Sequence, residues 1–106
     1  MTLAELTERM HAFVASKGWY EPDSPHPQTP RNLAASLAIE SAEVLELFQW
    51  SDSCCQAALA DELADVMLYL LQIADLSGID LTAAVLGKLE RNADREWDER
   101  RGDDDD

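Results

Sequence analysis

Four carboxylates stand in two pairs near the middle of the sequence, each pair with a spacing of three residues. Glu40 and Glu43 form the first pair, and Glu62 and Asp65 form the second. In an α-helix this spacing places both side chains of a pair on one face, a turn apart. Carboxylates held close together repel one another unless a cation lies between them. The pattern indicates either a divalent-metal site or a solvated acidic groove.

Magnesium suits such a set of ligands, because it binds through carboxylates together with water and substrate phosphates. Mn²⁺ fits the same ligands. A metal bound there would clamp a polyphosphate and lower the pKa of an attacking water. In the second helix of the set, the line through Glu62 and Asp65 continues to Tyr69 and Gln72.

A second group of polar residues lies near the carboxyl-terminal end of the chain. Lys88, Asn92 and Arg95 follow one another at i, i+4 and i+7, which forms one stripe on a helix, and Arg91 lies nearby. Lysine and arginine bind phosphate oxygens, and asparagine hydrogen-bonds phosphate, sugar or base. The alternative is a helix that ends in basic residues because they suit its dipole.

Four helical segments are predicted to position these groups. Apolar residues recur at helical spacing, and Gly18 and Gly78 follow the first and third segments as helix-ending residues. Thr29 with Pro30 begins the second helix, and Asp80 caps the fourth. The expected helices span residues 3–16, 30–50, 56–76, and 80 to Arg95 or Trp97.

The one long irregular segment is expected at residues 18–30, where Pro22, Pro25, Pro27 and Pro30 exclude a helix. A loop of this length in a short domain is often functional.

The predicted fold class is all-α, a four-helix bundle completed by oligomerisation. The short connection between the third and fourth helices favours antiparallel neighbours. The third helix is apolar around almost its whole circumference, through Leu63, Val66, Met67, Leu68, Leu70, Leu71, Ile73 and Ala74. Such a helix is normally buried, and a chain of 106 residues needs a second copy to bury it fully.

The charge balance excludes one class of partner. Twenty-two acidic residues face eight basic ones, a formal net charge of −14. A nucleic-acid polymer needs basic patches for its phosphates, so this partner is not expected.

The sequence shows no sign of a membrane span or a signal peptide. No apolar run reaches the ~18 residues of a membrane span, and the amino terminus carries Glu5 and Glu8 where a signal peptide is basic. We therefore expect a cytoplasmic protein, with a domain at 1–97 and a disordered acidic tail at 98–106.

Taken in order, these motifs resemble the MazG-like all-α nucleoside triphosphate pyrophosphatases, most closely their short dCTP pyrophosphatase branch. The resemblance covers residues 3–97 and is carried by a series that is specific as a set. The series is Pro30-Arg31-Asn32-Leu33, Ile39-Glu40-x-x-Glu43-Val44-x-Glu46-Leu47-Phe48-Gln49-Trp50, Asp61-Glu62-Leu63-Ala64-Asp65-Val66, Ile79-Asp80-Leu81 and Lys88-x-x-x-Asn92.

The resemblance implies hydrolysis between the α- and β-phosphates of a nucleotide, giving a nucleoside monophosphate and pyrophosphate. It implies that the four carboxylates hold Mg²⁺, with Glu43 also orienting the water. It implies that Lys88 and Asn92 contact phosphate and sugar, and that Trp50 stacks on the base. A homo-oligomer, a dimer of dimers, is implied as well.

One departure from the family pattern concerns the base. The dCTP-specific members carry a histidine two residues before Pro-Arg-Asn, where this chain has Gln28, and His26 lies two residues earlier. His26 is either a base contact or an ordinary loop residue, and Gln28 and Trp19 are further candidates for contact with the substrate. The predicted activity is Mg²⁺-dependent hydrolysis of dCTP or modified pyrimidine nucleotides, for nucleotide-pool sanitation. The alternatives are another base preference within the superfamily, or a non-catalytic helical module that binds a partner or a metal.

Overall fold

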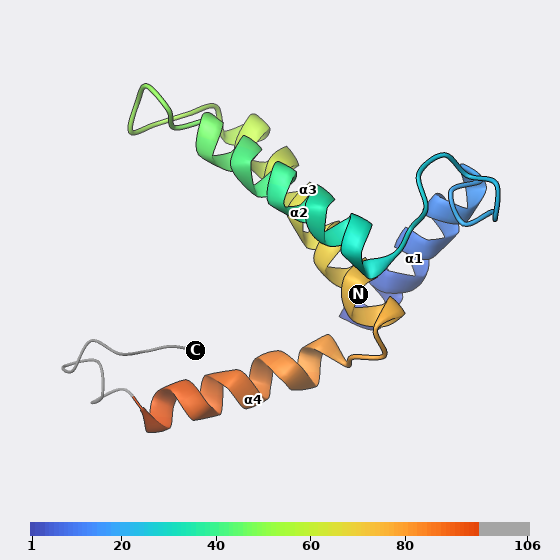
Figure 1. Ribbon diagram of the computed structural model, residues 1–106. Helices are drawn as coiled ribbons and strands as arrows, with labels where there is room; N and C mark the ends of the chain where they lie inside the picture. Colours follow the sequence, from blue (N-terminus) through green and yellow to red (C-terminus); the bar gives the residue numbers. More distant parts are fainter. Residues whose placement is uncertain (96–106) are drawn as a thin grey trace.

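The computed structural model describes residues 1–95, and these residues form four helices and no strand (Figure 1). The prediction of an all-α chain is confirmed. The helices are α1 (Leu3–Ser16), α2 (Pro30–Glu46), α3 (Gln56–Leu76) and α4 (Leu81–Asp94). Trp97, one of the expected ends of the fourth helix, and the predicted tail at 98–106 lie outside the described residues.

Local capping explains where three of the helices begin. Thr2 and Glu5 form a reciprocal capping box, in which the Glu5 amide donates to Thr2 Oγ1 at 3.1 Å and the Thr2 amide to Glu5 Oε1 at 2.7 Å. Thr29 accepts from the Asn32 amide, and Asp80 accepts from the Ala83 amide. Such caps satisfy amides that have no partner inside a helix.

The second helix is shorter than predicted. It ends at Glu46, and the expected continuation to Trp50 was wrong. The amides of Leu47, Phe48 and Gln49 donate to carbonyls three residues back, at 3.2, 3.0 and 3.2 Å, so the chain tightens into turns. These turns lead into the Ser51–Cys55 segment before α3.

The core lies where α2, α3 and α1 meet. α2 and α3 run side by side in opposite directions, and α1 packs against α3 (Figure 1). The buried apolar residues come from all three of these helices and are Met10, Val14, Leu33, Leu71 and Ala74. Antiparallel packing of α2 on α3 is the arrangement that would bring the two acidic pairs together.

The fourth helix does not fold back on the third, and the expectation of antiparallel neighbours was wrong. The chain turns by 102° between α3 and α4, so α4 extends away from the other helices (Figure 1). Gly78 makes this turn possible with a φ of +73°, and the Ile79 amide is bonded to the Ala74 carbonyl at 2.8 Å.

A single chain therefore leaves apolar helix faces uncovered. On α3, Leu63 is 51% exposed, and Leu68 and Leu70 are exposed as well. On α4, Val85, Leu86 and Leu89 are exposed at helical spacing. The complete burial of the third helix expected from its sequence is not achieved within one chain.

Among the described residues, no single helix is long and apolar enough to cross a membrane. Only the bent pair of α3 and α4, taken together, has the length and apolar composition of a membrane span.

Candidate active site

Three carboxylates from α2 and α3 form an acidic cluster. Glu40 lies on α2 and faces Glu62 and Asp65 on α3, and one carboxylate oxygen of each lies within 4.8 Å of the others. The two-pair spacing predicted this meeting, and antiparallel packing produces it. Glu43, the fourth residue of the predicted set, does not belong to this group of three, although it lies close enough for the charge of Glu62 to affect it.

Two carboxylate oxygens of the cluster are shielded from solvent and lack a hydrogen-bond donor. Oε1 of Glu40 and Oε1 of Glu62 are buried and have no hydrogen-bond partner. Burying a charged oxygen without a partner is costly, and native structures normally pair such atoms with a donor or a cation.

The pKa values of the glutamates in and beside the cluster show that their charged forms are unfavourable there. Burial, followed by the charges of Glu43 and Asp65, raises the pKa of Glu40 above its ordinary value. The charge of Glu62, followed by burial, raises the pKa of Glu43. Burial and the proximity of Glu40 raise the pKa of Glu62. These three glutamates therefore resist ionisation beside their neighbours, and a bound cation would relieve that resistance.

The donor set fits a hard divalent cation. All three candidate ligands are carboxylates, which Mg²⁺ and Mn²⁺ prefer, and the unpartnered buried oxygens of Glu40 and Glu62 would be available for coordination.

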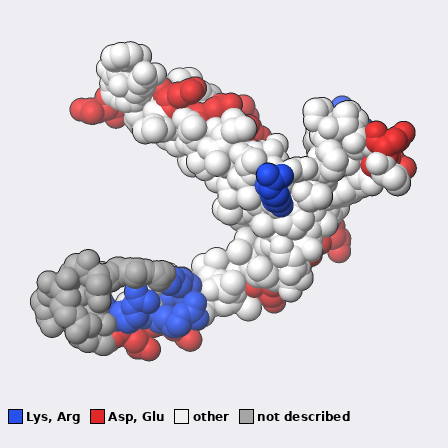
Figure 2. Space-filling model, in the orientation of Figure 1, with Lys and Arg blue, Asp and Glu red and all other residues white. Residues whose placement is uncertain are grey.

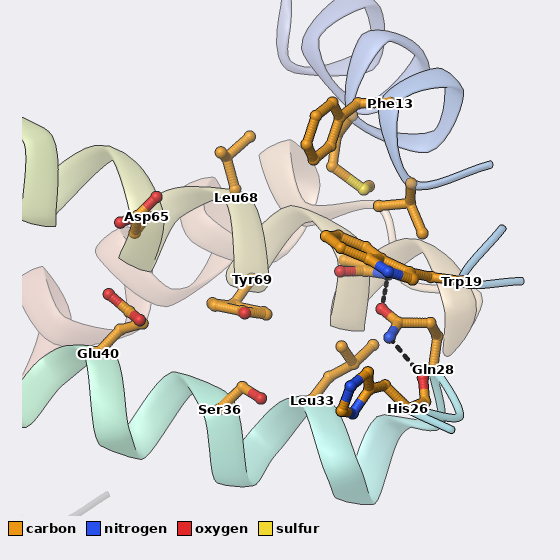
Figure 3. Close-up of a pocket in the computed structure, with 13 residues that line it drawn as sticks. Phe13, Trp19, His26, Gln28, Leu33, Ser36, Glu40, Asp65, Leu68 and Tyr69 are labelled. Atoms are coloured by element: carbon orange, nitrogen blue, oxygen red, sulfur yellow. Dashed lines mark hydrogen bonds between the residues drawn. The ribbon is translucent and has the colours of Figure 1, made fainter. Parts of the chain in front are cut away.

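The cluster opens into a cavity of about 460 Å³. Glu40 and Asp65 lie at one end, whereas Trp19, Gln28 and His26 lie at the other, with Tyr69 between them (Figure 3). The remaining lining residues are Met10, Phe13, Val14, Leu33, Ser36, Leu68 and Gln72. A pocket of this size with an apolar, aromatic wall and a few polar groups is typical of small-molecule sites.

Comparison with known proteins identifies the family. The model of the MazG-like family matches residues 35–104, which include α3, α4 and most of α2. The chain belongs to the MazG-like family.

Relatives of known name agree with this assignment. The MazG-like chain is 36% identical over 98 residues to dCTP pyrophosphatase 1 of Rattus norvegicus and 37% identical to that of Homo sapiens, in each case over 82% of this chain and 55% of the relative. It spans about half the length of these curated relatives. A solved structure of a pyrophosphatase from Archaeoglobus fulgidus DSM 4304 superposes with a TM-score of 0.74 at 36% identity, over 87% of this chain and 89% of that one.

The structure of the MazG-like chain brings two of the predicted substrate residues to the cavity. Trp19 and Gln28 both line it, and Trp19 packs edge to face against Phe13 with ring centroids 5.8 Å apart. Trp50 is not part of the cavity, because it follows the end of α2 and is 89% exposed.

The predicted basic stripe also lies away from the acidic cluster of its own chain. Lys88, Asn92 and Arg95 belong to α4 and its carboxyl end, and none of them lines the cavity. Acidic side chains gather along the arm formed by α2 and α3, whereas basic side chains gather at the far end of α4 (Figure 2). Within one chain the two halves of the predicted site are therefore separate.

Several residues of the site were not assigned a role from the sequence. Tyr69 and Gln72 continue the helical line that begins with Glu62 and Asp65, so their position was visible in the spacing. Tyr20 gave no such signal, because only the folded loop brings its hydroxyl to Gln72 Nε2, which donates to it at 3.1 Å. Burial, together with the charge of Asp75, raises the pKa of the Tyr20 hydroxyl, while the Gln72 bond opposes this, and the hydroxyl stays protonated near neutral pH.

Proposed function

We propose that this chain is a Mg²⁺-dependent nucleoside triphosphate pyrophosphohydrolase that cleaves between the α- and β-phosphates and releases a nucleoside monophosphate and pyrophosphate. Support comes from membership of the MazG-like family and from the names of the relatives, which are pyrophosphatases from mammals and an archaeon. The likeness to dCTP pyrophosphatase 1 favours dCTP or a modified pyrimidine deoxynucleotide as substrate.

One observation carries the proposal: the acidic cluster and the aromatic chamber are two ends of a single cavity. A nucleotide has the matching polarity, with a charged phosphate end and a flat, hydrogen-bonding base. With its phosphates at Glu40 and Asp65, its base would lie towards Trp19, Tyr69 and Gln28. A plain metal-storage site would need no such chamber.

Glu40, Glu62 and Asp65 are the residues that would hold the metal. When bound, Mg²⁺ supplies charge neutralisation for the phosphates and a lower pKa for coordinated water. Glu43 stands beside this group on α2, and in the proposal its carboxylate orients the attacking water and accepts its proton. One water is consumed, the α–β phosphoanhydride bond breaks, and the bridging oxygen leaves with one of the two products.

A second copy of the chain completes the site in this proposal. The exposed apolar faces of α3 and α4 are of the kind that subunit contacts cover. Since α4 turns away from its own acidic cluster, a symmetric partner is the natural source of Lys88 and Asn92 for the phosphates. The positive charge of Lys88 would offset part of the charge of the nucleotide in a strongly acidic protein, and the Asn92 amide would donate a hydrogen bond to it. The proposed assembly is a tetramer made of two such dimers.

The direct test is pyrophosphate release from a panel of canonical and 5-modified nucleoside triphosphates, with Mg²⁺, with Mn²⁺ and with EDTA. We expect metal-dependent release of equal amounts of pyrophosphate and monophosphate, greatest with deoxycytidine nucleotides. Release of single phosphate would contradict the assigned bond. A folded protein that binds Mg²⁺ but turns over no nucleotide would instead be a metal-binding or interaction module.

A further inference from the structure

A buried glutamine connects the wall of the cavity to the rest of the fold. Gln72 is only 3% exposed, and its Nε2 donates to Gln28 Oε1 at 2.9 Å and to the Tyr20 hydroxyl at 3.1 Å. Gln28 donates from its own Nε2 to the His26 carbonyl at 2.7 Å (Figure 3). A buried amide needs such partners, and here both N–H groups of Gln72 are used.

The next bonds outward order the donors when the His11 ring is neutral. His11 Nε2 lies 2.8 Å from Asp75 Oδ2, and a carboxylate only accepts, so Nε2 carries a proton. In the neutral imidazole Nδ1 is then the acceptor, and the Tyr20 hydroxyl donates to it. The Tyr20 oxygen is thereby left to accept from Gln72. The network has one donor–acceptor order from Asp75 to Gln28.

This order prevents the side-chain amide of Gln28 from rotating by half a turn and exchanging its oxygen with its NH₂ group. A free glutamine presents its oxygen and its NH₂ group in either order at little cost. In the cavity, the reversed Gln28 would set its NH₂ group against that of Gln72 and its oxygen against the His26 carbonyl. The mismatch with Gln72 leaves a part-buried amide N–H without a partner, which is costly, and the mismatch at the exposed His26 carbonyl loses a further hydrogen bond. Gln28 therefore offers its remaining N–H and its remaining lone pair in a fixed order.

We propose that Gln72 locks Gln28 in this way so that the cavity distinguishes cytosine from uracil and thymine. The inference rests on the proposed function and names the residues that select its base. Cytosine carries an amino donor next to a ring-nitrogen acceptor, whereas uracil and thymine carry an oxygen acceptor next to an N–H donor at the same two positions. A locked amide matches one order and leaves unpaired groups with the other, and this kind of mismatch gives strong discrimination.

The test measures kcat/KM for dCTP, dUTP and dTTP with the full chain and two variants. Gln72→Leu keeps the size of the side chain and removes the amide, and Tyr20→Phe removes one hydroxyl that orients Gln72. We expect Gln72→Leu to reduce the preference for dCTP at least about tenfold, equivalent to about 1.4 kcal/mol. Tyr20→Phe should reduce it in the same direction by less. Gln56→Leu makes the same chemical change at an exposed position of α3 and should leave the preference unchanged.

Two results would overturn the lock. One is wild-type protein that hydrolyses dCTP, dUTP and dTTP equally well. The other is an equal loss of kcat/KM for all three substrates in both variants, which would make Gln72 a structural tether of the loop. If Gln72→Leu does not fold, the substrate preference of Tyr20→Phe decides. Failure of the proposed function looks different, because wild-type protein would then release no pyrophosphate from any nucleotide.

Discussion

Glu40 on α2 and Glu62 on α3 each bury an Oε1 atom without a hydrogen-bond partner, and both residues belong to the same acidic cluster. Neutral residues at these two positions would remove this cost and make the packing of α2 against α3 more stable. The arrangement therefore opposes folding of the metal-free protein and favours binding of a cation, which has consequences for stability that can be measured without any substrate.

The first prediction concerns the opposite effects of Glu62→Gln on stability and metal affinity. Without metal, this change removes a repulsive charge from the cluster, so we expect the variant to melt at a higher temperature than the wild type in EDTA. With Mg²⁺, the wild type should gain melting temperature and the variant should gain much less. Calorimetric titration should show Mg²⁺ affinity lower by at least about tenfold, the scale seen when metal-site residues are altered.

Asp61→Asn is the matched control for this prediction, because Asp61 is the exposed neighbour of Glu62 and loses the same charge. It should change neither the melting temperature in EDTA nor the metal affinity appreciably. Equal behaviour of the two variants would mean that the cluster is an ordinary solvated acidic face.

The second prediction is the pH dependence of stability in the absence of metal. The pKa values of Glu40, Glu43 and Glu62 are raised from 4.5, so the folded protein holds these protons more tightly than the unfolded chain does. Their favourable contribution is complete below pH 4.5, and it is lost as the pH rises through the folded-state pKa values. We expect the free energy of unfolding in EDTA to fall as the pH rises from 4.5 to neutrality.

The overall charge of −14 also favours the protein at lower pH, so a difference between two proteins has to be measured. Glu62→Gln retains that overall effect but removes one of the coupled carboxylates, and its stability should depend less steeply on pH in urea unfolding experiments. Parallel curves for the variant and the wild type would show that the cluster contributes nothing. Saturating Mg²⁺ should flatten the wild-type curve, because the bound ion keeps the carboxylates ionised.

The third prediction separates the role of Glu43 from that of the three clustered carboxylates. Glu43→Gln keeps the size of the side chain and removes a base, so kcat should fall by about 10²–10⁴-fold, the usual contribution of a general base. Circular dichroism and Mg²⁺ affinity should stay close to those of the wild type. Glu46→Gln is the control one turn further along α2, and it should retain activity. A large loss of Mg²⁺ affinity in Glu43→Gln would make Glu43 a metal ligand first.

The parts of this site that could be predicted from the sequence are those determined by local spacing. The interval between Glu62 and Asp65, extended to Tyr69 and Gln72, places four residues on one face of α3 by helix geometry alone, and the last three of them line the cavity. The caps at Thr29 and Asp80 were likewise predictable, because a side-chain acceptor beside free amides is a local interaction.

The parts that could not be predicted depend on contacts between distant segments or on competition between turn types. The direction of α4 is set by a turn at Gly78 whose length is compatible with several angles between helices. Trp50 follows the end of α2, where the chain tightens into turns, and no pattern of residue types predicts that the helix ends there. The bond from Gln72 to Tyr20 joins residues 52 positions apart and exists only in the folded loop.

The last prediction tests whether α4 of one subunit serves the acidic cluster of another. Glu62→Gln and Lys88→Ala should each be nearly inactive alone. If Lys88 comes from the partner, each site of a mixed dimer combines position 62 of one subunit with position 88 of the other. One site then carries both substitutions, and the other site carries neither. Random reassociation makes half of the dimers mixed, so mixing equal amounts should restore about a quarter of wild-type activity. If Lys88 serves its own chain, every site in the mixed dimer keeps one lesion and no activity returns.

The mixing experiment has its own control in the apolar face of α4. Leu89 is 59% exposed in the single chain, and Leu89→Asp places a charge where the proposed partner packs. Adding Leu89→Asp to both variants should yield monomers in light-scattering measurements and abolish the recovery on mixing. Ala83→Asp, at an exposed position of the same helix that lies on neither the Leu89 face nor the Lys88 face, should leave both the assembly and the recovery intact. Recovery that persists among Leu89→Asp monomers would exclude α4 as the shared element.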